Sequence, residues 1–290
     1  MKKNALISLI TVLLVFSSHA QKKFSGAKKI SNGKGTLWGY WGYNRSNYTK
    51  SDLHLKGPGY DFTLKGATAS DNPSKSLDQY VNIKTITVPQ FNLRVGYYYK
   101  DRYSISLGYD HMKYVFDDAN QVLLDGTINP GLDSTWSGTY HDKPVVTNRQ
   151  NFHYENTNGL NYIHARISRT DKLYQSKNKI FGLSSTFGLG LGCLLTINDL
   201  NFAQQFDRYT ASISGLGISA HAGLRLEIYR HFFIQAELNG GWINLTHVRT
   251  RPRDKSAYAD QKYWFGQRNV VMGFFIYIKS QSVCQDCPVW

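Results

Sequence analysis

Cysteine, charge and long apolar runs are all scarce in this chain of 290 residues. Its 3 cysteines are too few for a small secreted scaffold held together by several disulfides. After the N-terminal segment no apolar run is long enough for a membrane-spanning helix, and the mean hydropathy is polar. Charged residues make up only 19% of the chain, but aromatic residues reach 14%, too many for a disordered chain. These three classes of protein are therefore excluded.

Acidic residues are also few, since 20 Asp and Glu face 34 Lys and Arg, which gives a formal charge of +14. A basic excess of this size is typical of nucleic-acid-binding proteins. Here the basic residues are spread along the chain instead of gathering on one helix, and the N-terminus indicates export. We therefore expect no nucleic-acid partner.

The N-terminus has the three parts of a secretory signal. A short positive start precedes the apolar run Ala5–Phe16, and small residues follow at Ser18 and Ala20. The run is too short to cross about 30 Å of hydrocarbon as a helix. We predict that residues 1–20 are a signal peptide and that residues 21–34 form a flexible basic periplasmic leader.

From Gly35 onward the chain alternates apolar and polar residues, the period of β-strands. The segment Gly215–Ile228 is the clearest case. In Lys179–Ile197 one face is bulky and apolar, while the other consists mostly of Gly, Ser and Thr. Small residues suit the interior of a narrow closed barrel, and a bulky apolar face suits lipid. A soluble β-sandwich would instead carry Lys, Glu and Thr on its solvent face.

The pattern predicts an all-β fold, a closed antiparallel transmembrane β-barrel of eight strands over residues 35–279. The expected strands are 35–49, 89–99, 103–116, 159–171, 178–197, 209–229, 231–249 and 261–279. Long connections at 50–88, 117–158, 198–208 and 250–260 alternate with short ones, which is typical of long extracellular loops and short periplasmic turns. An even strand count places both termini in the periplasm, with residues 280–290 as a C-terminal periplasmic tail.

At its ends the chain resembles small bacterial outer-membrane β-barrel proteins of the OmpA/OmpX type. The similarity lies in the export junction between Ala20 and Gln21, in the first strand Leu37–Tyr43 and in the aromatic last strand Gly273–Ile278. The junction is of a sort common in Bacteroidota. The similarity covers residues 35–279, implies an outer-membrane location, and carries no activity with it.

The inward faces of the expected strands collect ionisable side chains. These lumen residues are Arg94, Asp110, His164, Arg166, Arg225, Glu227 and Glu237. The interior of an eight-stranded barrel is only wide enough for side chains, so charges there should pair. We expect a network that closes the lumen. The alternative is a narrow pore or ligand-binding barrel, in which the same groups line water.

An enzyme is a second alternative, resting on Ser219, His221 and Glu237. Ser219 and His221 share one strand face, and Glu237 on the next strand is placed to orient the imidazole. Outer-membrane lipid A deacylases carry such a triad on barrel strands, but with His before Ser, the reverse of the order here. This arrangement would make the protein a lipid A or phospholipid hydrolase.

Three further expectations concern ligands. One long connection carries the basic residues Arg249, Arg251, Arg253 and Lys255. We expect them either to contact lipid A phosphates or to pair with the acidic segment 117–158. Cys284 and Cys287 suit a local disulfide in an oxidising periplasm. The histidines lack metal-ligand spacing and no glycine-rich nucleotide loop exists, so we expect neither metal nor cofactor.

Together these observations predict a non-enzymatic outer-membrane barrel with a filled lumen. It would serve envelope integrity or surface interaction through its loops. Its expected partners are outer-membrane lipid, including lipopolysaccharide, and a protein of unknown identity.

Overall fold

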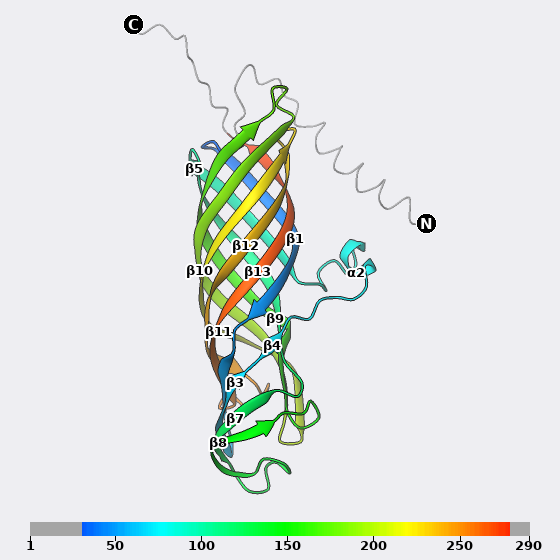
Figure 1. The fold of residues 1–290 in the computed structure, drawn as a ribbon, viewed down its shortest axis with the longest axis vertical. Coiled ribbons are helices and arrows are strands. Elements are labelled where there is room, and N and C mark those ends of the chain that lie inside the picture. The colour runs from blue at the N-terminus through cyan, green and yellow to red at the C-terminus, as the bar shows by residue number, and fades with distance from the viewer. Residues whose placement is uncertain (1–30, 279–290) are drawn as a thin grey trace.

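A computed structural model describes residues 31–278, and eight of its strands form a closed barrel (Figure 1). These strands are β1 (Thr36–Tyr48), β5 (Phe91–Lys100), β6 (Tyr103–Phe116), β9 (His153–Gln175), β10 (Phe181–Phe202), β11 (Gln205–Ile228), β12 (Phe232–Arg249) and β13 (Tyr258–Tyr277). Each strand pairs antiparallel with the next in this order. The predicted fold class and strand count are therefore confirmed.

The first and last strands close the barrel. β1 pairs with β13 along its whole length, from Thr36 opposite Tyr277 to Tyr48 opposite Phe265. Because every barrel strand then has two neighbours, its backbone N–H and C=O groups are paired inside the protein. A β-structure needs this pairing to cross lipid.

The barrel wall has the two faces that the alternation predicts. Large apolar side chains point outward and are exposed, and we call this set the apolar belt. Its members are Leu93, Val95, Ile105, Leu107, Ile167, Leu189, Leu191, Leu224, Leu238, Val270, Met272 and Phe274. Small and polar side chains of the same strands are buried, among them Ser184 and Thr186 on β10.

The long connections are largely folded, which the sequence analysis did not predict. Where loops were expected at 50–88 and 117–158, the chain forms β2 (Ser51–Gly57), β3 (Tyr60–Ala67), β4 (Ala69–Ser70), β7 (Gln121–Ile128) and β8 (Gly138–Val146). β2 pairs with the far part of β13, and β3, β7 and β8 continue the sheet from there. The expected loop at 198–208 is also wrong, because β10 and β11 run on to a short turn between Phe202 and Gln205.

These strands and the far parts of β6, β9, β10, β12 and β13 form an extension of the barrel (Figure 1). Its interior is apolar and includes Leu53, Phe62, Tyr154, Phe202 and Ile243. The interior thus changes along the barrel axis from polar, behind the apolar belt, to apolar in the extension. The short turns β5–β6, β9–β10 and β11–β12 lie at the opposite end, which we call the turn end.

A short helix, α2 (Asp78–Val81), lies outside the barrel beside β1 (Figure 1). Among residues 31–278 no helix has the length and apolar character to cross a membrane. The expected signal peptide, most of the leader and the C-terminal tail fall outside the described residues. Of the expected leader, residues 31–34 are described, and Ser31 and Asn32 are buried at the turn end.

Candidate functional site

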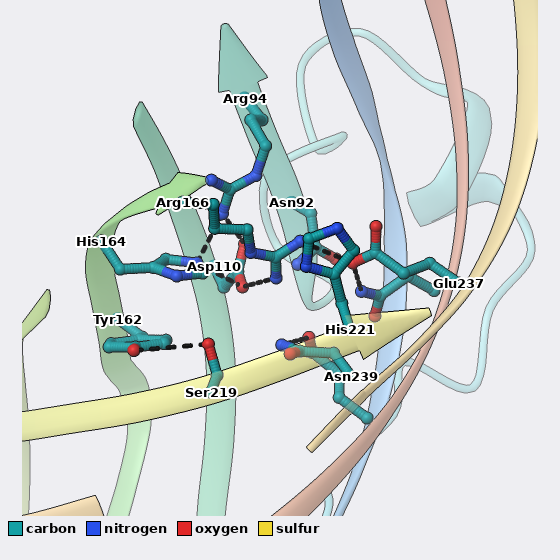
Figure 2. A network of polar contacts seen from close by, with 12 residues as sticks. Asn92, Arg94, Asp110, Tyr162, His164, Arg166, Ser219, His221, Glu237 and Asn239 are labelled. Carbon is teal, nitrogen blue, oxygen red and sulfur yellow. Dashed lines mark hydrogen bonds and ion pairs between the residues drawn. The ribbon is translucent and has the colours of Figure 1, made fainter. Parts of the chain in front are cut away.

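The candidate site is the polar lumen of the barrel (Figure 2). Period-two geometry turns alternate residues of each strand inward, and all seven predicted lumen residues are 4% exposed or less. Five of them form one network that links four strands: Arg94 on β5, Asp110 on β6, His164 and Arg166 on β9, and Glu237 on β12.

Charge-assisted contacts join the five residues. Asp110 Oδ2 lies 2.9 Å from His164 Nε2 and 3.5 Å from Arg166 Nη2. Arg166 Nη1 donates to Glu237 Oε1 at 2.7 Å. Arg94 lies 3.8 Å from the Asp110 carboxylate and also contacts His164. Two arginines therefore face two carboxylates, and the network is close to neutral when the imidazole is uncharged.

The network also uses neutral groups that the sequence analysis did not single out. Arg94 donates to Tyr40 Oη at 3.1 Å and to Ser106 Oγ at 3.2 Å. Glycine makes room for these contacts, because a Cβ on Gly108 would come within 2.3 Å of the Arg94 guanidinium carbon. The small inward face predicted from the sequence is thus what lets long charged side chains lie across the lumen.

Nearer the turn end, Glu227 has its own set of partners. It pairs with Lys172 and accepts hydrogen bonds from Ser184 Oγ at 2.6 Å and Ser31 Oγ at 2.5 Å. Ser31 comes from the segment before β1, so the chain itself covers this mouth of the barrel. The sequence analysis did not single out either residue. Lys172 was recognisable only by its place on a strand, and Ser31 only by its place before the first strand.

Arg225 departs from the expectation that lumen charges pair with opposite charges. No carboxylate lies within ion-pair distance of it in the described part of the chain. Its guanidinium carbon lies 4.3 Å from the ring centre of Phe233 and 5.3 Å from that of Trp38. It donates to Gln235 Oε1 at 2.8 Å and to Tyr98 Oη at 3.1 Å. Aromatic faces and neutral acceptors stabilise this cation in place of a carboxylate.

Very little space remains between these side chains. The void lined by Arg94, Arg166, His221 and their neighbours measures about 10 Å³. One water molecule needs about that much room. Around these residues the lumen is therefore largely filled by side chains.

The structure does not assemble the hydrolase candidates into a triad. Ser219 and His221 do share the inward face of β11. However, among the described contacts Ser219 pairs with Tyr162 and His221 with Ser168, at 3.5 and 3.4 Å. Glu237 is engaged by Arg166 and, at 3.2 Å, by Asn269. No described hydrogen bond links the imidazole to either Ser219 or Glu237.

The basic residues Arg249, Arg251, Arg253 and Lys255 lie at the far tip of the extension. Tyr258, which follows them, is about a dozen residues along β13 from Val270 of the apolar belt, roughly 40 Å of strand. Arg251 is buried and bonds Asp207 at 2.6 Å and the carbonyl of Phe202 at 2.8 Å. The buried member of this cluster therefore pairs with the β10–β11 hairpin instead of the acidic segment 117–158, and the contact with lipid A phosphates stays a prediction.

Two other expectations concern metals and disulfides. Residues 31–278 contain no group of three or more His, Cys, Asp or Glu side chains arranged to hold a metal ion. Cys284 and Cys287 lie outside the described residues.

No protein-family model and no curated protein sequence matches this chain. Solved structures do. The outer membrane protein OprG from Pseudomonas aeruginosa is 11% identical, with a TM-score of 0.41 over 86% of this chain and 99% of that one. Neisserial surface protein A is 9% identical, with a TM-score of 0.39 over 83% and 99%. The outer membrane protease OmpT from Escherichia coli is 9% identical, with a TM-score of 0.31 over 83% and 96%. With eight antiparallel strands closed by β1 and β13, the chain has the architecture of small outer-membrane β-barrel proteins of the OmpA/OmpX type.

Proposed function

We propose that this protein is a non-enzymatic barrel of the bacterial outer membrane that presents its extension outside the cell for interaction with surface partners. The filled lumen is the observation that carries the proposal. Its side chains occupy the space that a pore would need, and Ser219, His221 and Glu237 bond to other partners instead of to each other. The protein then acts as a membrane anchor, and its function falls to the extension.

The orientation follows from the two ends of the barrel. Outer-membrane barrels have short periplasmic turns and longer extracellular connections. The short turns here lie at the same end as the start of β1 and the end of β13. This end faces the periplasm, and the extension faces the exterior.

A groove at the tip of the extension is the best place for a partner. Its volume is about 490 Å³, within the range of ligand sites. Four connections meet there, contributing Pro58, Leu132, Gln205 and Arg253 among others. Apolar walls beside two arginines and two aspartates, Arg251, Arg253, Asp207 and Asp254, suit a ligand with both apolar and charged parts.

Cells lacking the gene, complemented with wild type or with the groove variant Leu132→Asp/Arg253→Glu, test this proposal. We expect wild type to restore cell-surface adhesion and the groove variant not to do so. A defect in envelope leakage that both versions repair would favour a role in envelope integrity. A change in the acyl pattern of lipid A between the strains, measured by mass spectrometry, would contradict the non-enzymatic function.

A further inference from the structure

A short arm of the chain lies against the outside of the barrel instead of joining the extension. It consists of residues 71–90, between β4 and β5, and contains α2. Figure 1 shows α2 to the side of the barrel, next to β1. Its apolar side chains point away from the protein, with Leu77 83%, Val81 78% and Ile83 67% exposed.

One aromatic residue fastens the arm to the barrel wall. The carbonyl of Tyr80 accepts a hydrogen bond from Tyr43 Oη at 2.5 Å, and the two rings meet edge to face at 4.8 Å. The Tyr80 hydroxyl accepts from Arg45, whose guanidinium lies 5.5 Å from the ring centre. At the base of the arm, Asp71 accepts from the backbone N–H of Ser46 at 3.1 Å. The arm is thus held at one level of β1.

On β1 and β13 that level lies within the apolar belt. Tyr43 lies opposite Val270, a belt residue, and its ring packs on Trp41 at 4.6 Å. Aromatic residues of this kind mark the border between lipid and water. One pair farther outward, Arg45 lies directly opposite Arg268, which on its other side lies opposite Leu238 of the belt.

The arginine pair points to an anion. Like charges directly opposite each other on neighbouring strands are destabilising. No hydrogen bond or ion pair of the Arg268 side chain is found among residues 31–278. The arm carries two exposed lysines, Lys75 and Lys84, and two carboxylates, Asp71 and Asp78, so its own formal charge is zero and the positive charge at this level comes from the arginines. A pair of cations beside an apolar belt complements the anionic headgroups of a membrane surface.

We infer that the arm is a membrane-interface element. Leu77, Val81 and Ile83 enter the boundary between headgroups and acyl chains of the outer leaflet, while Arg45 and Arg268 face the phosphate of an anionic lipid. This inference rests on the proposed function, in which the apolar belt spans the membrane.

Site-directed spin labelling tests the position of the arm. Cys193, Cys284 and Cys287 are changed to Ser, and single labels are placed by Val81→Cys, Leu189→Cys and Ser134→Cys. The protein is reconstituted in vesicles of phosphatidylcholine and phosphatidylglycerol. Leu189 lies in the belt and Ser134 is exposed on the extension, so they report lipid and water. We expect the ratio of oxygen to nickel-chelate collisions at position 81 to resemble that at 189.

The outcomes of this experiment distinguish the membrane-interface position of the arm from the membrane position of the barrel. A water-like label at 81 with a lipid-like label at 189 overturns the inference and leaves the barrel's membrane position intact. Water-like labels at both positions overturn the proposed function as well. A label at 81 protected from both reagents would indicate a protein partner and would also contradict the inference.

A second measurement tests the arginine pair. We expect phosphatidylglycerol to raise the urea midpoint of the wild-type barrel over that in pure phosphatidylcholine. Arg268→Gln should at least halve this shift, whereas Lys255→Gln at the tip of the extension should keep it. An equal shift in wild type and Arg268→Gln would rule out the phosphate contact.

Discussion

His164 stacks face to face on Tyr162, with ring centres 3.9 Å apart and the planes 16° from parallel. The two residues are neighbours on the inward face of β9, yet they belong to different interiors. His164 bonds Asp110 in the polar lumen, whereas Tyr162 is part of the apolar core of the extension. Their contact marks the level at which the interior changes character. On one side of this level the interior is a network of charged and polar side chains, and on the other side it is an apolar core.

The Arg166–Glu237 pair gives the first prediction. Glu237→Leu leaves Arg166 buried without its shortest ionic contact, so we expect a loss of about 3–5 kcal/mol in the free energy of unfolding. The double variant Arg166→Leu/Glu237→Leu should lose less than the sum of the two single changes. Urea unfolding in lipid vesicles measures all three. Simple additivity would show that the two side chains do not depend on each other.

The filled lumen gives the second prediction. Wild-type protein in planar bilayers should show no channel steps, because side chains largely fill its lumen. Arg94→Ala/Arg166→Ala, which truncates the two largest side chains of the network, should be silent too, because the apolar core of the extension still seals the interior. Lys262→Ala, which changes an exposed residue of the wall, serves as the control and should stay silent. Channel steps from wild type would contradict the closed lumen.

The apolar core of the extension gives the third prediction. The Phe202 ring lies 5.1 Å from that of Phe62 and 5.2 Å from that of Tyr60. We expect Phe202→Ala to cost the extension about 3–5 kcal/mol, the usual range for a buried phenylalanine. Proteolysis of residues 117–152 should speed up.

The barrel itself should be untouched by that change. Its heat-modifiable shift in gel electrophoresis should be the same in Phe202→Ala and wild type. Tyr209→Ala, at an exposed position of the neighbouring strand β11, should alter neither readout. Loss of the gel shift in Phe202→Ala would mean that the barrel and the extension fold as one unit.

A histidine in the extension gives the fourth prediction. His54 lies between two carboxylates, 2.7 Å from Asp61 and 2.6 Å from Asp260. Partial burial lowers its pKa, but the hydrogen bonds to Asp61 and Asp260 outweigh it, so the pKa lies above the usual 6.5. The charged imidazolium therefore stabilises the folded extension below pH 6.5, and this contribution is lost as the pH rises through the raised pKa.

Proteolysis of the extension in wild type should accordingly speed up toward alkaline pH, after correction for the activity of the protease. The effect should be small, at most about 1 kcal/mol, because the group is partly exposed. His54→Gln should be cleaved at a rate that changes less with pH. The same pH dependence in both proteins would assign the effect to another group.

The sequence predicted the eight barrel strands because alternation is a local property of the chain. It missed β2 and β3 although they alternate too, as Leu53, Leu55, Phe62 and Leu64 are buried. Their outward residues, such as Lys56 and Asp61, are polar and exposed. A criterion that requires an apolar outward face misses such strands. Alternation between an apolar inner face and a polar outer face identifies them.

By itself the sequence determined which side chains point into the barrel and which point out, because that depends only on position along a strand. Only the tertiary structure decided the partners. Arg166 and Glu237 are 71 residues apart, and their contact depends on the register and closure of the barrel. The aromatic surroundings of Arg225 depend on the same closure, and the contact of Tyr80 with β1 depends on how the arm folds back on the wall. Tertiary packing brings these distant residues together, and no local pattern in the chain encodes which of them will meet.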